Sequence, residues 1–240
     1  MKHYWINIDR CVDRFEFMSK QLENKDIENY RISAETPETI TKYDVKKHEY
    51  ADSTKEEDSC MLSHLKAIQK GYDDGDEYFC VVEDDIEIQK LDFEKILDYV
   101  NDIQIKKNET IGMVQLHTNS NVGIIELYKS FGKTGNILEK RDEFAYPSTG
   151  YYLISRVAAA KILNKFKINN GTFDLSYSTW CAADCLLYMH VVVYIISYPV
   201  AISKLDYGSI IHPSHLIHHK NANDVANQIW QQNNMLDMFV

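Results

Sequence analysis

The stretch that decides the fold runs from Tyr78 to Asp85 and reads YFCVVEDD. Its first part, up to Val82, is an unbroken apolar run, which indicates a strand of a parallel sheet that is covered on both faces. The run stops at three adjacent carboxylates, Glu83, Asp84 and Asp85. Ligands of open α/β sheets bind outside the carboxyl ends of the strands. We therefore expect these carboxylates to lie at a binding site.

Strand-like and helix-like patterns alternate along the rest of the chain. Strand patterns are found at 4–8 (YWINI), 111–117 (IGMVQLH), 151–155 (YYLIS) and 191–197 (VVVYIIS). Apolar residues recur at helical spacing near 11–22, 61–72, 93–103, 157–166 and 225–236. We expect a loop or a short irregular lobe at 34–54, and loops or short hairpins in the glycine-spotted stretch 119–147. The alternation predicts an α/β fold with a mainly parallel central sheet flanked by helices.

Composition limits the functions that the chain can have. Its 240 residues suit a single domain, and a net charge of −10 makes binding to a nucleic-acid backbone improbable. An odd count of five cysteines, mostly within apolar stretches, predicts reduced thiols and a cytoplasmic protein. The N-terminus has no signal-peptide layout, and the longest apolar run is far shorter than the ~20 residues of a transmembrane helix. We therefore expect no transmembrane anchor.

The three carboxylates repel one another unless a cation offsets their charge. A hard divalent cation with oxygen ligands would do so. Side chains alternate along an extended segment, so Glu83 and Asp85 are expected to point the same way. One would serve the metal, and the other a ribose or a metal-bound water. The alternative is that these residues are solvated charges at the end of a strand.

Two arginines stand near the start of the first predicted helix. Arg10 and Arg14 are four residues apart and are expected to share a helical face. Beside a helix N-terminus they could hold the diphosphate of a nucleotide. The alternative is that they form salt bridges with Asp9, Asp13 or Glu16, and by themselves the residues favour this alternative.

Other polar groups carry weaker signals. Ser63 and His64 are adjacent within a predicted helix, but this is not a nucleophile motif, and such a histidine is more often half-buried and hydrogen-bonded. Cys181 and Cys185, together with the histidines between positions 212 and 219, match no zinc spacing.

Five segments in order resemble glycosyltransferase family 25, the group that contains lipopolysaccharide and procollagen galactosyltransferases. The segments are Ile6–Arg14, Glu57–His64, Val81–Asp85, Tyr152–Ala159 and Asp184–Leu187. The resemblance spans roughly residues 4–209 and is carried by the order of motifs that are each weak alone. It implies a GT-A-type fold, a nucleotide-sugar donor and, usually, inversion at the sugar carbon.

The resemblance also implies roles for individual residues. The donor-site candidates are Asn7, Asp9, Arg10, Arg14, Ser63, His64 and Glu83. The expected metal is Mn²⁺ (or Mg²⁺), with Asp85, Glu83 and His212 as ligands. Asp184 is the first candidate for the base that deprotonates the acceptor hydroxyl, and Asp84 is the alternative.

The expected function is transfer of a hexose from a UDP-sugar to a glycan or glycoprotein acceptor in glycan biosynthesis. UDP-galactose is the family default, and UDP-glucose comes next. Residues 1–118 are expected to form the donor half of one domain, and residues 119–240 the acceptor half. The apolar tail at 235–240 is expected to dock on the core, with a second subunit or a membrane face as alternatives. A metal-dependent nucleotide-sugar hydrolase and a catalytically inactive binding module remain alternative functions.

Overall fold

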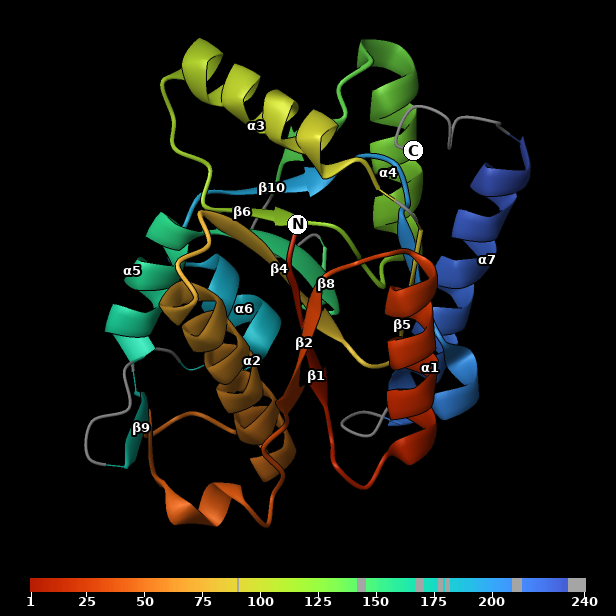
Figure 1. The fold of residues 1–240 in the computed structure, drawn as a ribbon. Helices are drawn as coiled ribbons and strands as arrows, with labels where there is room; N and C mark the ends of the chain where they lie inside the picture. The colour runs from red at the N-terminus through yellow and green to blue at the C-terminus, as the bar shows by residue number, and fades with distance from the viewer. Residues whose placement is uncertain are drawn as a thin grey trace.

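The computed structural model describes residues 1–89, 91–141, 146–166, 171–176, 179, 182–208 and 213–232. Within these ranges a seven-stranded sheet has the order β2-β1-β4-β8-β6-β10-β7 (Figure 1). Its strands are β1 His3–Asn7, β2 Asn29–Ser33, β4 Tyr78–Glu83, β6 Met113–Gln115, β7 Leu138–Lys140, β8 Tyr151–Ser155 and β10 Val193–Ile196. Strand β8 is antiparallel to β4 and β6, and β7 to β10, while the other neighbours are parallel. The predicted α/β class with a mainly parallel sheet is confirmed.

Strand β4 is covered on both faces, as its apolar run predicts. Phe79 and Val81 belong to one hydrophobic core, and Cys80 and Val82 to the other. All four side chains are fully buried. Since β4 pairs in parallel with β1, the carboxyl ends of the two strands lie side by side.

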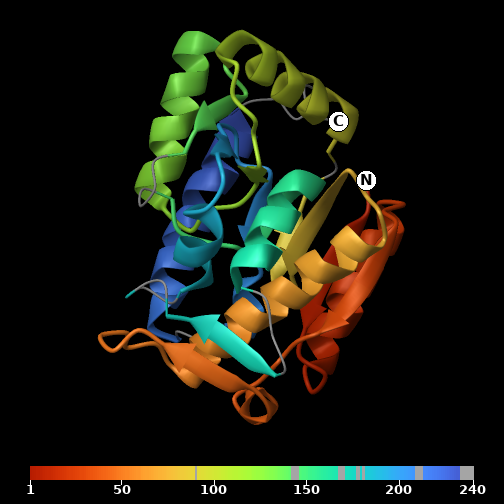
Figure 2. The ribbon, with the colours of Figure 1, turned by 90° about the vertical axis from the view of Figure 1, so that its left-hand side faces the viewer.

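Helices cover both faces of the sheet (Figures 1 and 2). One core is closed by α2 Lys55–Asp73, α5 Arg156–Phe166 and α6 Ala183–Tyr188. The other is closed by α1 Val12–Asn24, α3 Phe93–Lys107, α4 Asn121–Thr134 and α7 Leu216–Gln232. Within the described ranges, no helix is both long and apolar enough to cross a bilayer.

Helix α4 corrects the expectation of loops and hairpins at 119–147. Ser120 caps the helix by accepting a hydrogen bond from the backbone N–H of Gly123 at 3.0 Å, and Gly135 ends it in a left-handed conformation. Gly123 lies within this helix, where a larger residue would not fit, because a Cβ at this position would lie 2.7 Å from the ring of Tyr146. The glycines therefore cap and pack a helix instead of interrupting it.

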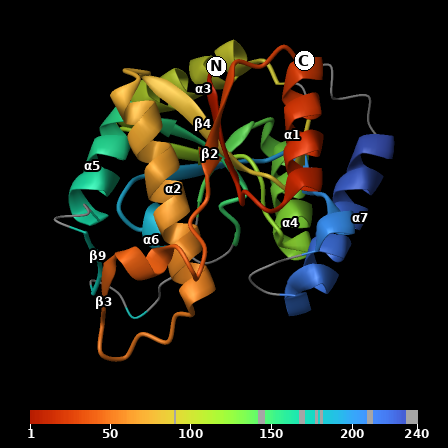
Figure 3. The same ribbon diagram turned by 60° about the horizontal axis from the view of Figure 1, so that its bottom comes forward.

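Several short strands follow no clear hydrophobic alternation, and the sequence did not predict them. One is β2, at the edge of the sheet. In the stretch predicted as a loop or lobe, a 3-10 helix at Ile40–Lys42 leads into β3 Asp44–Lys47, which pairs in parallel with β9 Thr172–Leu175 (Figure 3). Directly after the acidic motif, β5 Ile86–Ile88 pairs with β11 Ala201–Ser203.

A glutamine of α1 takes the place of a further strand beside β5. The amide nitrogen of Gln21 donates to the carbonyl of Ile86 at 2.9 Å, and its amide oxygen accepts from the N–H of Ile88 at 2.8 Å. Buried backbone groups need such partners, and Gln21 is itself buried. The side chain thereby attaches α1 to the strand that leaves the acidic motif.

Candidate active site

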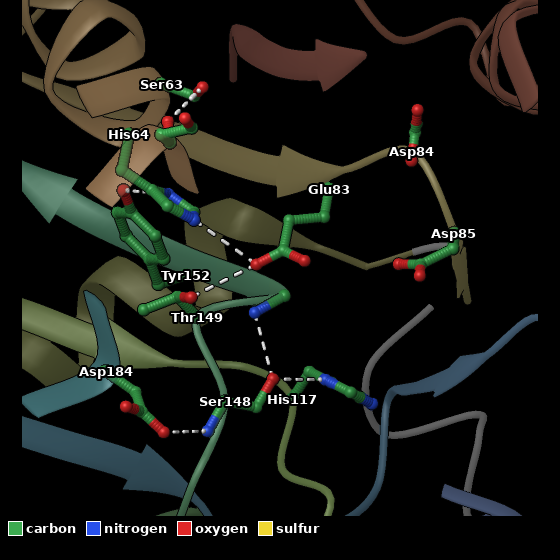
Figure 4. A network of polar contacts seen from close by, with 12 residues as sticks. Ser63, His64, Glu83, Asp84, Asp85, His117, Ser148, Thr149, Tyr152 and Asp184 are labelled. Atoms are coloured by element: carbon green, nitrogen blue, oxygen red, sulfur yellow. Dashed lines mark hydrogen bonds and ion pairs between the residues drawn. The ribbon is translucent and has the colours of Figure 1, made fainter. Parts of the chain in front are cut away.

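The acidic motif forms the turn between β4 and β5, beside the carboxyl end of β1. The carboxylate of Asp84 accepts hydrogen bonds from the amide of Asn7 at 2.7 Å and from Nη1 of Arg14 at 2.9 Å. In Figure 4 the carboxylate of Asp85 lies on the side of Glu83, whereas the side chain of Asp84 points away from it. The structure thus brings the two predicted strand ends together.

Arg14 ties this turn to a distant part of the chain. Its Nη1 lies 3.4 Å from the carboxylate of Asp85, and its Nη2 donates to the carbonyls of Tyr207 at 3.2 Å and Gly208 at 2.9 Å. The residue is only 6% exposed, so these contacts are screened little by solvent. Arg14 therefore links the acidic turn to the segment at Tyr207 and Gly208.

Arg10 lies in a different environment, and the expectation that the two arginines share a helical face is wrong. Helix α1 begins at Val12, so Arg10 precedes it. Its guanidinium is exposed and lies 3.8 Å from Glu38. The alternative pairing with nearby acids is not observed either, because Arg14 pairs with Asp84 instead.

Asn7 and Asp9 are joined by one arginine of β2. The side-chain oxygen of Asn7 accepts from Nε of Arg31 at 2.9 Å, and the guanidinium of Arg31 also pairs with Asp9. Hydrogen bonds from Arg31 and Ser33 lower the pKa of Asp9. Asn7 is buried and positions the acidic turn, whereas the carboxylate of Asp9 is exposed.

Glu83 is the centre of a polar network (Figure 4). Its Oε1 lies 3.2 Å from Nε2 of His64 and accepts a hydrogen bond from the hydroxyl of Thr149 at 3.1 Å. The other ring nitrogen of His64 lies 3.1 Å from the hydroxyl of Tyr152. Burial by itself would raise the pKa of Glu83, but the interactions with His64 and Thr149 outweigh it and hold the pKa below its usual range.

Asp85 behaves in the opposite way. Burial and then the charge of Glu83 raise its pKa to about 7, although Arg14 acts against this. Burial also raises the pKa of Asp84, against the effects of Arg14 and Asn7. Asp84 and Asp85 therefore share a single guanidinium, and Glu83 adds a third carboxylate beside His64, so negative charge is left in excess. Oxygen ligands with excess charge fit a hard divalent cation such as Mn²⁺ or Mg²⁺.

The acidic turn opens on a pocket of about 260 Å³. A water molecule takes roughly 30 Å³ of liquid, so the pocket has the volume of roughly nine water molecules, more than a bare metal ion needs. Its lining includes Arg10, Arg14, Ser63, His64 and all three carboxylates of the motif. The hydroxyl of Ser63 is already engaged, because it accepts from the N–H of Glu35 at 2.8 Å and donates to the carbonyl of Ser59 at 2.7 Å.

Asp184 approaches the same region from α6, on the side of Thr149 (Figure 4). Its carboxylate accepts from the N–H of Ser148 at 3.2 Å. The backbone of Ser148 has a φ of 117°, which is strained for a residue with a side chain and typically costs about 1–3 kcal/mol. Hydrogen bonds from Gly150, at 2.9 Å, and from Tyr188, at 2.9 Å, help to hold it there. Strain of this kind is typical of functional sites.

Two histidines extend the polar region toward α7. His117 is buried, and burial lowers its pKa to about 4, so it is neutral at neutral pH. Its Nδ1 lies 2.9 Å from the hydroxyl of Ser148. His219 of α7 contacts the amide of Asn119 at 3.1 Å. His212, the predicted third metal ligand, lies outside the described residues.

The sequence did not predict several members of the site. Thr149 contacts Glu83, and Tyr152 contacts His64. His117 and His219 lie toward α7, and Cys60 lines the pocket. No local pattern marks Thr149 or His117. Cys60 stands four residues before His64 in a helical stretch, and this spacing was a readable sign that both face one way.

A family model now agrees with the geometry. The model of glycosyltransferase family 25, described as LPS biosynthesis protein, matches residues 1–177. The chain belongs to glycosyltransferase family 25. The protein is therefore a nucleotide-sugar-dependent glycosyltransferase. No curated protein matches the sequence.

Solved structures show only remote likeness. Mouse xyloside xylosyltransferase 1 in its apo form is 8% identical, with 78% of this chain and 67% of that chain covered and a TM-score of 0.33. A UDP-glucose pyrophosphorylase complexed with UDP-glucose is 10% identical, with 97% and 99% covered and a TM-score of 0.36. A glycosyltransferase involved in glycosylation of the major capsid of PBCV-1 is 10% identical, with 93% and 98% covered and a TM-score of 0.33. The family assignment does not depend on these similarities.

Proposed function

We propose that the protein transfers galactose or glucose from a UDP-sugar, with inversion, to a hydroxyl group of a glycan or protein acceptor in a GT-A-like fold. The observation that carries the proposal is the position of Asp85. Its carboxylate lies in the acidic turn at the carboxyl end of β4 and lines the pocket. Its pKa is raised to about 7 by burial and by the charge of Glu83. Arg14, 3.4 Å away, offsets this charge only in part, and a divalent cation would offset the rest.

Asp85 and Glu83 are the proposed ligands of Mn²⁺ or Mg²⁺, and His212 stays a proposed third ligand. When bound, the metal would neutralise charge that develops on the departing diphosphate. Arg14 fixes the acidic turn through Asp84, and the exposed Arg10 lines the pocket, where it would pair with the diphosphate of a bound donor.

The other donor-site candidates take different positions around the pocket. Ser63 and His64 line it, and Asn7 supports Asp84 from β1. Asp9 accepts hydrogen bonds from Arg31 and Ser33 and is exposed, so a ribose or base can reach the remaining lone pairs of its carboxylate. All the residues that line the pocket fall between positions 6 and 85, which supports residues 1–118 as the donor half.

Asp184 is the proposed general base. It lies across Glu83 from the donor side, next to Ser148 and Thr149, and it belongs to the proposed acceptor half at 119–240. A carboxylate there would take the proton of the acceptor hydroxyl as the oxygen attacks the sugar carbon. Asp84 suits this role less well, because both of its oxygens already accept hydrogen bonds, from Asn7 and Arg14. The free thiols of Cys11, Cys60, Cys80 and Cys185 fit a reducing compartment, and we place the enzyme in the cytosol.

Calorimetric titration of UDP into the metal-free protein, with and without Mn²⁺, tests the proposal. We expect UDP to bind tightly only with Mn²⁺, and Asp85→Asn to lose this dependence while it stays folded. Asp206→Asn is the matched control, because the Asp206 side chain is exposed on the segment that contacts Arg14. Equal UDP affinity with and without Mn²⁺ would refute the metal assignment. If the UDP-sugar is consumed at the same rate with and without acceptors, the protein is a hydrolase. If UDP does not bind at all, the protein is an inactive module.

A further inference from the structure

Three potential ligands of different chemistry converge on the wall of the donor pocket. Cys60 and His64 lie four residues apart on α2, so their side chains leave the same face of the helix. Glu83 meets them from the end of β4. The thiol sulfur, an imidazole nitrogen and a carboxylate oxygen of these residues all lie within 4.8 Å of one another.

We infer that Cys60, His64 and Glu83 form a binding site for a thiophilic divalent cation, with Zn²⁺ the best fit. Thiolate, imidazole and carboxylate are the ligands that zinc takes in proteins. Tetrahedral bonds of about 2.0–2.1 Å place two ligand atoms about 3.3 Å apart. The observed separation of Nε2 of His64 and Oε1 of Glu83 is 3.2 Å, so this pair of atoms already has the spacing that zinc requires.

The surroundings of the three residues support a metal site. Nδ1 of His64 lies 3.1 Å from the hydroxyl of Tyr152, which can fix the ring with Nε2 toward the ion. Thr149 orients the carboxylate of Glu83. The thiol of Cys60 has no hydrogen-bond partner among the described residues, so it is available as a ligand. All three ligands line the pocket, which leaves the fourth position open to water or to a ligand.

This site differs from the proposed Mn²⁺ site in its chemistry. Mn²⁺ and Mg²⁺ prefer oxygen ligands, and a thiol with an imidazole selects zinc instead. On binding, zinc replaces the proton of the Cys60 thiol, which passes to solvent, and it separates Glu83 from His64. Glu83 is shared by both sites. Zinc is therefore an inhibitor of the transfer reaction, and this consequence alone rests on the proposed function.

Direct zinc binding to the metal-free full chain tests the site, with a chromogenic chelator as competitor. We expect one tight Zn²⁺ per chain, with affinity at least tenfold weaker in Cys60→Ser. Cys11→Ser is the control, because Cys11 is also half-buried but is not among the described residues that line the pocket. Its affinity should equal that of the wild type. Asp85→Asn should keep its zinc affinity while it loses Mn²⁺-dependent UDP binding, which separates a failure of the zinc site from a failure of the proposed function.

Cobalt substitution gives a second measurement that does not depend on the folding of a variant. The wild-type protein with one equivalent of Co²⁺ should show a thiolate-to-cobalt charge-transfer band in the near ultraviolet and visible bands of tetrahedral intensity. A Co²⁺ spectrum without the thiolate band would overturn the inference. Equal zinc affinities of the wild type and Cys60→Ser would do the same.

Discussion

Replacement of Asp85 by asparagine should stabilise the metal-free protein, and the effect should grow with pH. In the folded protein, burial and the neighbouring Glu83 raise the pKa of Asp85 to about 7 from an ordinary 3.8. Because the pKa of Asp85 is higher in the folded than in the unfolded state, its carboxyl group contributes stability that is fully present below pH ~4. This contribution is lost as the pH rises to ~7. Asparagine has nearly the same shape and does not titrate, so the variant avoids this loss.

The size of the effect follows from the two pKa values. The difference between 3.8 and about 7 corresponds to roughly 4 kcal/mol at 1.36 kcal/mol per pKa unit, as an upper limit. The Asp85 side chain is 16% exposed, so solvent reduces this figure. We therefore expect a pH-dependent gain of about 2 kcal/mol at pH 8 over pH 4.5.

Urea unfolding of both proteins in the presence of a chelator, across this pH range, measures the gain. Asp206→Asn, which removes an exposed carboxylate of the segment next to Arg14, is the control, and its effect should be smaller than that of Asp85→Asn. Saturating Mn²⁺ should then stabilise the wild type by about 2.7 kcal/mol at 100 times its dissociation constant, and leave Asp85→Asn unchanged. The reasoning is refuted if the stability difference between Asp85→Asn and wild type is the same at pH 4.5 and pH 8.

Three further predictions concern single substitutions, and the last compares two glycines. Arg14→Lys should lower the free energy of unfolding in urea by about 3 kcal/mol, because lysine cannot bridge Asp84 and two carbonyls. A loss below about 1 kcal/mol would contradict the proposed role of Arg14 in holding the acidic turn. Asp184→Asn should lower kcat by roughly 10²–10⁴-fold without changing Mn²⁺-dependent UDP affinity, and normal turnover would exclude it as the base. Gly71→Ala should cost about 1–3 kcal/mol, because its Cβ would lie 2.5 Å from a buried phenylalanine ring. Gly132→Ala, where nothing lies within 4 Å, should instead add about 0.5–1 kcal/mol; equal effects of the two glycine changes would disprove the packing argument.

The elements that the sequence predicted best are those whose pattern is set by burial. The apolar run of β4 specifies a strand between two cores, and its position next to β1 follows from parallel pairing. Helix α4 was missed because Gly123 resembles a breaker, whereas its lack of a side chain serves a contact with Tyr146. Edge strand β2 was missed because hydrogen bonds to β1 create it, with little help from apolar side chains.

The candidate site divides in the same way. The acidic motif was visible because its charges end a buried strand, but its partners are not local. Arg14 meets Asp84 across 70 residues of sequence, and the carbonyls of Tyr207 and Gly208 across 193 and 194. A local pattern carries no information about such pairings. The exposed Arg10 and the buried Arg14 therefore looked equivalent until the fold separated them.

Helix α1 contacts this region at two points: Arg14 pairs with Asp84 in the acidic turn, and Gln21 bonds to the backbone of β5, which follows the turn. The two residues stand seven apart, or two helical turns, on one side of the helix. Undocking of α1 would therefore release the turn and leave two backbone groups of β5 without partners. The amide protons of α1 and of residues 84–88 should then exchange with solvent as one cooperative unit, at a rate that a bound donor slows for both.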